Sequence, residues 1–256
     1  MFSLRNKMIA ILSELQSKFS AVAVKADFEA EGTNLSELVF LNELVCSVGL
    51  KLFLKIGGAE AVFDLNQAKL FGAKAVIVPV VESEFALKKF MLAFNRVFRN
   101  DCVVVEKILN AETKTCAENF DKIMQMGSGF LNSVTIGRVD LADSLNLSRN
   151  EIDSSVVFKM CQFFFERAKK FGLNVGLGGG LGVQSFKFLS KLKFDRFETR
   201  KIVFKNEHDE LKFRNAILKS TEFELFCLQF KKNIFQFLAC DDELRISMLK
   251  KRLSEF

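Results

Sequence analysis

The hydrophobic pattern of the chain alternates between two kinds of segment. Short apolar runs rich in β-branched residues are typical of buried parallel strands, and the stretches after them repeat apolar residues every three or four positions, as amphipathic helices do. Further helices are predicted over 4–19 and from about residue 208 onward. The expected strands lie at 21–27, 52–56, 75–81, 103–112, 134–140, 174–177 and 196–204.

This repeated strand–helix unit predicts the α/β class and a (β/α)8 TIM barrel. Because only seven strands are evident, we expect the first strand to be irregular or missing, with the N-terminal helix in its place. The chain is predicted to form one domain over 1–256, made of an N-terminal helix at 1–19, the barrel at 20–205 and a C-terminal helical extension at 206–256.

Two neighbouring apolar runs lead into acidic residues, Glu112 and Asp140. In a barrel of parallel strands, the carboxyl ends of the strands meet at one mouth, where active sites lie. Two carboxylates from adjacent strands can hold a hard divalent cation such as Mg²⁺ or Mn²⁺. Acids in such places also cap helices or pair with Lys or Arg, and the pattern alone leaves both interpretations open.

The two-residue period of a strand predicts that charged side chains share the inward face of the barrel. The expected inward sets, one for each of three strands, are Lys25, Asp27 and Glu29; Ile108, Asn110 and Glu112; and Ile136, Arg138 and Asp140. Inward charges are costly unless they are paired or bound to a metal. Their convergence therefore indicates a functional site at the mouth.

A glycine-rich run at 176–182 lies between a predicted strand and a helix. Backbone amides at Gly178 and Gly179 can hold an anion, or the glycines can serve a tight turn that needs positive φ angles. Farther along, Arg200 can bind an anionic substrate or pair with Glu198. Both pairs of alternatives stay open at this point.

Composition excludes several classes of site and partner. The chain has one histidine, His208, so neither a histidine metal cluster nor a Ser-His-Asp triad can be assembled. The six cysteines form no CxxC motif and are expected to be reduced thiols. The net charge of +6 is spread along the chain without a basic, aromatic-rich stripe, so we expect an anionic small substrate and no nucleic acid. No apolar run is long enough to span a membrane, so no membrane partner is expected. The start of the sequence lacks the features of a signal peptide, so we expect a cytoplasmic location.

Two segments are distinctive, Asn110-Ala-Glu-Thr113 and Ile136-Gly-Arg-Val-Asp-Leu-Ala-Asp-Ser-Leu145, and further characteristic segments lie at 25–32, 54–58, 78–83 and 197–201. In this order, they resemble the HpcH/HpaI aldolase/citrate lyase family. The resemblance covers roughly 20–205. It implies a (β/α)8 barrel that makes or breaks carbon–carbon bonds through a metal-bound enolate.

The resemblance also implies roles for individual residues. Glu112 and Asp140 match the two metal-binding carboxylates, with Mg²⁺ or Mn²⁺ as the cofactor. Lys55 falls where pyruvate aldolases have an arginine that contacts the 2-oxo acid, and with Arg138 it would stabilise the enolate.

The family's catalytic histidine is absent from this chain. The segment where it belongs contains Glu29 and Glu31, which are the candidate bases. The remaining expected substrate contacts are Lys25, Gly178, Gly179 and Arg200.

These observations favour a metal-dependent carbon–carbon lyase of the aldolase type, acting on a small anionic 2-oxo acid or its aldol adduct. One alternative is a citrate lyase-like acyl-CoA lyase. Another is a non-catalytic barrel that binds an anionic metabolite or a partner protein, which the missing histidine and the Phe-rich C-terminal extension favour. A homo-oligomer is expected, because helices beyond the barrel commonly mediate assembly in this family.

Overall fold

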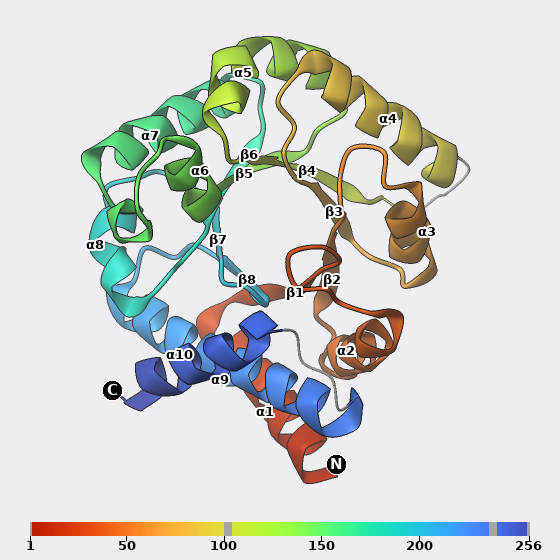
Figure 1. The fold of residues 1–256 in the computed structure, drawn as a ribbon, viewed down its shortest axis with the longest axis vertical. Helices are drawn as coiled ribbons and strands as arrows, with labels where there is room; N and C mark the ends of the chain where they lie inside the picture. The colour runs from red at the N-terminus through yellow and green to blue at the C-terminus, as the bar shows by residue number, and fades with distance from the viewer. Residues whose placement is uncertain (1, 100–103, 236–239, 255–256) are drawn as a thin grey trace.

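The computed structural model describes residues 2–99, 104–235 and 240–254. Eight strands form a closed barrel in sequence order, with the helices around it (Figure 1). The strands are β1 Ala21–Asp27, β2 Lys51–Lys55, β3 Ala75–Val78, β4 Glu106–Ala111, β5 Ser133–Gly137, β6 Asn174–Gly178, β7 Arg196–Glu198 and β8 Ile202–Lys205. The predicted α/β barrel is therefore confirmed.

The helices lie between the strands and at both ends of the chain. The first five are α1 Phe2–Phe19, α2 Leu35–Val48, α3 Val62–Leu70, α4 Glu84–Phe98 and α5 Lys114–Gly127. The others are α6 Arg138–Ser144, α7 Ser155–Lys170, α8 Phe186–Leu189, α9 Glu210–Phe235 and α10 Cys240–Ser254, with short 3₁₀ helices η1 Arg149–Glu151 and η2 Val183–Ser185. None of the helices in the described ranges combines the length and apolarity needed to cross a membrane.

The last two strands differ from the sequence prediction. Strands β1 to β7 pair in parallel, whereas β8 runs antiparallel to both β7 and β1. The expected single strand at 196–204 is thus two strands, joined by a turn in which the Thr199 N–H donates to Ile202 O at 2.9 Å. The first strand, which we expected to be irregular or missing, is present. It pairs with β2 over five successive residues, and it is irregular only in its register against β8. The turn falls within the polar stretch 198–201, between Phe197 and Ile202, and the sequence prediction includes this stretch in one continuous strand.

Two other predictions reach residues outside the described part of the chain. The strand expected at 103–112 begins at Glu106, and residue 103 is not described. Cys102 and the side chain of Cys240 are likewise outside it. The described cysteines, Cys46, Cys116, Cys161 and Cys227, are free thiols, as expected.

The barrel interior is apolar in its middle layer and polar at both ends. The middle layer consists of Ala23, Phe53, Ala75, Ile77, Ile108 and Val203. At the amino ends of the strands, Arg196 binds Glu106 and Ser133, with N–O distances of 2.9 and 2.7 Å. The charged residues that remain inside the barrel therefore gather at the carboxyl ends.

The C-terminal extension returns from the base of the barrel to its mouth. Because β8 is reversed, it ends beside the start of β7, where Arg196 pairs with Lys205, and α9 begins close to that base. Helix α9 packs on α1, and α10 packs on α9 through Leu225, Leu228, Ile246 and Leu249 (Figure 1). This route brings side chains of α9 and α10 to the mouth.

Candidate functional site

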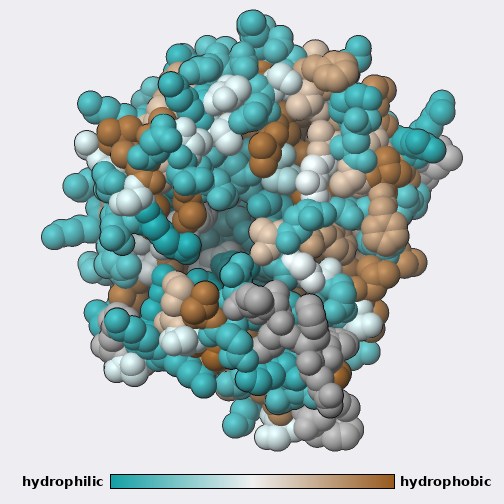
Figure 2. Space-filling view, in the orientation of Figure 1, coloured by the Kyte–Doolittle hydropathy of each residue, from teal (hydrophilic) through white to brown (hydrophobic). Residues whose placement is uncertain are grey.

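A cavity of about 340 Å³ lies at the carboxyl ends of the strands. Figure 2 shows it as a hollow at the centre of the face, with hydrophilic residues around it. Its lining comes from β1, β2, β4, the start of α6, the glycine loop after β6, the β7–β8 turn, α9 and α10. Most of the residues predicted for the site lie here.

Lys55 and Asp27 form an ion pair at the ends of adjacent strands. The register pairs the two residues across β1 and β2, and Lys55 Nζ lies 3.3 Å from Asp27 Oδ2. The other oxygen, Asp27 Oδ1, accepts the N–H groups of Glu29 and Ala30 at 3.0 Å each. Burial lowers the pKa of Lys55, but the carboxylates of Asp27 and Glu112 outweigh burial and raise it above its ordinary value. The ammonium group of Lys55 is therefore charged at neutral pH.

Glu112 is buried at the end of β4, with only 2% of its surface exposed. Its Oε1 accepts the N–H of Val80 and its Oε2 accepts Asn110 Nδ2, both at 3.1 Å. Burial raises the pKa of Glu112, Lys55 opposes this shift and Asp140 adds to it. A carboxylate held in this way gains from a cation placed beside it.

Glu112 and Asp140 both lie beside Gly137. A Cβ atom at Gly137 would lie 2.6 Å from Glu112 Oε2 and 3.6 Å from Asp140 Oδ2, so the absent side chain leaves room for both carboxylates. Strand β5 ends at Gly137, and Asp140 lies in the first turn of α6. The expectation that Ile136, Arg138 and Asp140 share an inward strand face is therefore wrong, although Asp140 still reaches the cavity.

Arg138 lies away from the cavity. It is fully buried, its guanidinium pairs with Asp153, and it donates to Gly178 O at 3.3 Å and Gly179 O at 2.9 Å. The guanidinium also lies 5.1 Å from the centre of the Phe188 ring. These contacts hold the glycine loop in place, and they do not support the predicted role of Arg138 in enolate stabilisation.

The glycine loop forms a tight turn beside the cavity. Gly179 and Gly180 have φ angles of +79° and +68°, which L side chains rarely adopt, and both line the cavity. A Cβ atom at Gly178 would lie 2.9 Å from Glu198 Cγ. The tight-turn interpretation is confirmed, and anion binding by this loop stays a prediction.

The charged residues of β1 and β7 pair differently from the expectation. Lys25 Nζ lies 2.5 Å from Glu198 Oε1, and both line the cavity. Arg200 instead contacts Glu31, with Nε 3.2 Å from Oε1, because the turn after Glu198 carries it toward the β1–α2 loop. The expected Glu198–Arg200 pair is therefore wrong.

The two candidate bases have different surroundings. Glu31 lines the cavity and binds Arg200 and Lys201, one with each carboxylate oxygen. Glu29 is exposed, and its side chain lies against Gly57. Only Glu31 of these two is thus in a position to face a bound ligand.

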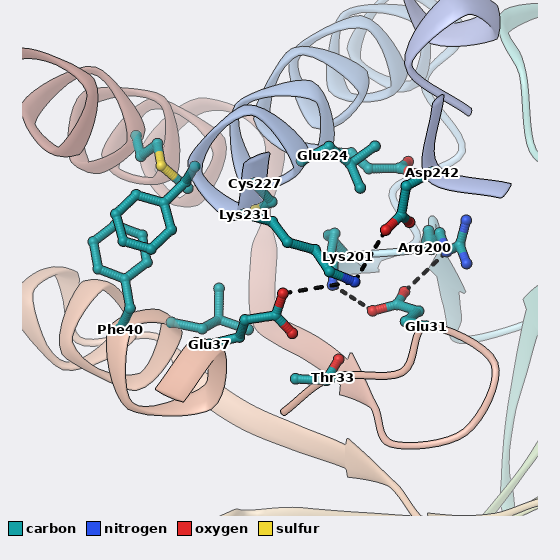
Figure 3. Close-up of a pocket in the computed structure, with 14 residues that line it drawn as sticks. Glu31, Thr33, Glu37, Phe40, Arg200, Lys201, Glu224, Cys227, Lys231 and Asp242 are labelled. Atoms are coloured by element: carbon teal, nitrogen blue, oxygen red, sulfur yellow. Dashed lines mark hydrogen bonds and ion pairs between the residues drawn. The ribbon is translucent and has the colours of Figure 1, made fainter. Parts of the chain in front are cut away.

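A buried network of charges lies behind Glu31 and Arg200 (Figure 3). Lys231 Nζ lies 3.0 Å from Asp242 Oδ2 and 3.6 Å from Glu37 Oε1. Burial lowers the pKa of Lys201, whereas the carboxylate of Glu31 raises it. The effect of the carboxylate is included in a net shift that is upward. The network joins the β1–α2 loop and the β7–β8 turn to the C-terminal helices.

Several residues of the site were not predicted from the sequence. Asp27 was placed on the inward face, but its pairing with Lys55 was not foreseen. Arg149, Glu224, Arg245 and Arg252 also line the cavity, from η1, α9 and α10. Their sequence neighbourhoods read as ordinary surface helices, so no local signal distinguished them.

The donor set at the mouth fits a magnesium-type ion. Mg²⁺ commonly takes one or two carboxylates and fills its other positions with water or ligand oxygens, and Glu112 and Asp140 supply the two carboxylates. Beside them, Asn110 Oδ1 is buried without a hydrogen-bond partner among the described residues. In the described ranges, no three or more His, Cys, Asp or Glu side chains are grouped so that they could hold a metal by themselves.

No protein-family model and no curated protein sequence matches this chain. Solved structures share its fold. An HpcH/HpaI aldolase from Desulfitobacterium hafniense DCB-2 is 13% identical, with a TM-score of 0.59 over 72% of this chain and 77% of its own. A citrate lyase from Burkholderia xenovorans LB400 is 12% identical, with a TM-score of 0.58 over 97% and 87%. Protein CitE from Mycobacterium tuberculosis, in complex with magnesium and pyruvate, is 16% identical, with a TM-score of 0.53 over 82% and 87%.

Proposed function

We propose that this protein is a metal-dependent carbon–carbon lyase of the aldolase type, acting on a 2-oxo acid through its enolate. The observation that carries the proposal is that Glu112 and Asp140 both lie beside Gly137, with Lys55 close enough for their charges to raise its pKa. The shared fold supports it, because the CitE structures contain magnesium with pyruvate or acetoacetate.

Glu112, Asp140 and the unpartnered oxygen of Asn110 are the proposed metal site. A divalent cation there supplies Lewis-acid stabilisation of the negative charge that develops on the oxygens of the 2-oxo acid. The protein's part is to hold the carboxylates: Val80 and Asn110 fix Glu112 by hydrogen bonds, and Gly137 leaves the space between the acids.

Lys55 is the proposed stabiliser of the enolate oxygen. Its raised pKa keeps it protonated, and Asp27 restrains its ammonium group at the rim of β2. A positive charge held in place beside the reacting oxygen stabilises a developing oxyanion without reorganisation. Lys25, Gly179 and Arg200 surround the same space and are proposed to contact the substrate.

Glu31 is the proposed proton acceptor, since it lines the cavity and Glu29 does not. Its two oxygens are paired with Arg200 and Lys201. An anionic substrate that draws Arg200 toward itself would free one oxygen of Glu31 to accept a proton. Substrate binding and base activation are thereby linked in this proposal.

The test is a calorimetric titration of Mg²⁺ or Mn²⁺, with and without oxalate, on the native chain and on Asp140→Ala. We expect metal binding that oxalate strengthens and that the substitution removes. Exchange of pyruvate methyl protons into deuterated water should require the metal and disappear in Glu112→Gln. If the native chain binds no metal under either condition, the lyase proposal is wrong and the non-catalytic barrel becomes the better hypothesis.

An acyl-CoA lyase remains the second candidate, because a citrate lyase shares the fold over 97% of this chain. Metal-dependent binding of a CoA thioester, stronger than that of the free acid, would favour it. We also propose that the chain works as a homo-oligomer in the cytoplasm, on the sequence grounds given above, and light scattering tests the assembly.

A further inference from the structure

The six carboxylates that line the mouth cavity differ in how many of their oxygens are already bonded. In four of them, both oxygens have partners among the described residues: Asp27, Glu31, Glu112 and Glu224. The fifth, Asp140, is a proposed metal ligand. The sixth is Glu198, whose Oε1 accepts Lys25 Nζ at 2.5 Å.

The second oxygen of Glu198 faces the cavity. Oε2 has no hydrogen-bond or ion-pair partner in the described part of the chain. It is also not among the buried polar atoms without a partner, which are Glu37 Oε1 and Asn110 Oδ1, so it is open to the space that Glu198 lines. Glu198 is only 7% exposed. It is thus a carboxylate that the protein holds by one oxygen and leaves available to a ligand at the other.

Two glycines at the same level of the barrel make room for carboxylates from the neighbouring strands. Gly137 and Gly178 are partners in the register of β5 and β6. Gly137 leaves space for Glu112 of β4, and Gly178 leaves space for Glu198 of β7: a Cβ atom at Gly178 would lie 2.9 Å from Glu198 Cγ and 3.1 Å from its Oε1. Glu198 therefore lies over the end of β6, next to the strand that ends beside the proposed metal ligands.

Cleavage of an aldol adduct requires a proton acceptor at oxygen. The hydroxyl group on the carbon that leaves gives up its proton, and its electron pair forms the carbonyl of the aldehyde. The carbon–carbon bond breaks, and its electron pair forms the enolate of the 2-oxo acid. The enolate carbon then takes up a proton, and the acceptor returns the hydroxyl proton to solvent, so that protons balance.

We propose that Glu198 is the residue that takes the hydroxyl proton, and that Lys25 positions Glu198 and stabilises the charge that develops on the hydroxyl oxygen. The inference rests on the proposed function and deepens it. Glu31 serves the proton at carbon, and Glu198 serves the proton at oxygen. Glu198 needs no rearrangement for this role, because its Oε2 is free of partners among the described residues.

The test compares two reactions in the presence of Mg²⁺. Exchange of pyruvate methyl protons into deuterated water requires the enolate alone. Joining pyruvate to an aldehyde, and cleaving the adduct again, also requires proton transfer at oxygen. The aldehydes to be used are formaldehyde, acetaldehyde, glycolaldehyde and glyoxylate. We expect Glu198→Gln to lower kcat for cleavage about a hundredfold, with little change in KM, and to lower the exchange rate at most about fivefold.

A second variant covers a loss of stability in the first. Glu198→Gln leaves the Lys25 ammonium group without its acid, and breaking a buried ion pair on one side is destabilising. The double variant Lys25→Met with Glu198→Gln removes both charges, and its cleavage rate should again fall at least about tenfold more than its exchange rate.

Glu106→Gln is the matched control. Glu106 is also an inward acid paired with a cation, Arg196, but it lies at the amino ends of the strands. It should cleave the adduct at the native rate.

Four results are decisive against the inference. If both Glu198 variants cleave as fast as the native chain, Glu198 is not the proton acceptor and the proposed lyase function stands. If cleavage and exchange fall equally, the role of Glu198 is structural. A native chain that exchanges pyruvate protons but joins pyruvate to none of the aldehydes has no step for Glu198 to serve. If the native chain neither binds Mg²⁺ nor exchanges protons, the inference and the proposed function both fail.

Discussion

The ammonium group of Lys55 lies 3.3 Å from Oδ2 of Asp27, where β1 and β2 end side by side. Asp27 is thus the carboxylate with which Lys55 forms an ion pair. Glu112 and Asp140 also act on Lys55 through their charges. Lys55 therefore contacts Asp27 while it lies close enough to the proposed metal ligands to interact with their charges.

Asp27→Asn should weaken metal binding. The amide oxygen can still accept the N–H groups of Glu29 and Ala30, but it no longer holds the ammonium group by charge. Lys55 then turns toward Glu112 and Asp140 and competes with the cation, and we expect the Mg²⁺ affinity to fall about tenfold in a calorimetric titration.

Asp195→Asn is the matched control for this substitution. Asp195 accepts the N–H of Val175 at 2.7 Å, at the amino ends of the strands. Its replacement should leave Mg²⁺ affinity unchanged. An unchanged affinity in Asp27→Asn as well would show that Lys55 does not compete for the site.

Gly137→Ala should damage the metal site more than the fold. The new Cβ atom would lie 2.6 Å from Glu112 Oε2, so the carboxylate must move and lose its bond from Asn110. Overpacking of this kind costs about 1–3 kcal/mol of stability. We expect calorimetry to show Mg²⁺ binding weakened by tenfold or more, on the order of 1.4 kcal/mol.

Gly58→Ala provides the comparison, because a Cβ atom there would meet nothing within 4 Å. It should fold and bind metal like the native chain. Equal metal affinities in the two variants would mean that Glu112 is not a ligand.

Glu112→Gln should stabilise the metal-free protein at neutral pH. The folded-state pKa of Glu112 is raised above its unfolded value, so its contribution to stability is full below the unfolded value of 4.5 and is lost as the pH rises through the folded-state pKa. At neutral pH the buried carboxylate is therefore a cost, which the amide removes. If the Asn110 amide rotates, its unpartnered oxygen can accept the new N–H.

The expected gain is about 1 kcal/mol at neutral pH, measured by thermal unfolding, and it should shrink toward pH 4.5. The same raised pKa predicts that the native chain loses Mg²⁺ affinity on acidification at a higher pH than an ordinary carboxylate site would. A destabilised Glu112→Gln variant at neutral pH would contradict the argument.

Glu31→Gln should be strongly destabilising. It removes the acid that binds buried Lys201, and breaking a buried ion pair on one side costs about 3–5 kcal/mol. Denaturant unfolding measures the loss. Glu14→Gln, which removes a partner of the exposed Lys18, should cost less than about 1 kcal/mol. Similar losses in the two variants would show that the buried network contributes little.

The proposed metal ligands were recognisable from the sequence because their signal is local. Glu112 follows an apolar run directly, and the strand period placed it on the inward face with Asn110. Asp140 was assigned to the mouth correctly but on the wrong element, since β5 ends at Gly137 and the helix period applies from Arg138 onward. The pattern changes from the two-residue period of a strand to the 3.6-residue period of a helix, and the seven residues of α6 are too few to show the helical period clearly.

The sequence by itself determined the alternation of strands and helices, the barrel and the end of the barrel where the acids gather, because each depends on hydrophobic periods a few residues long. Only the tertiary structure decided the direction of β8 and the partner of each charge. Lys25 and Glu198 are 173 positions apart, and Arg138 faces Asp153 instead of the cavity. Such choices depend on the register of the whole closed sheet and on the path of the C-terminal helices, and no short stretch of sequence contains either.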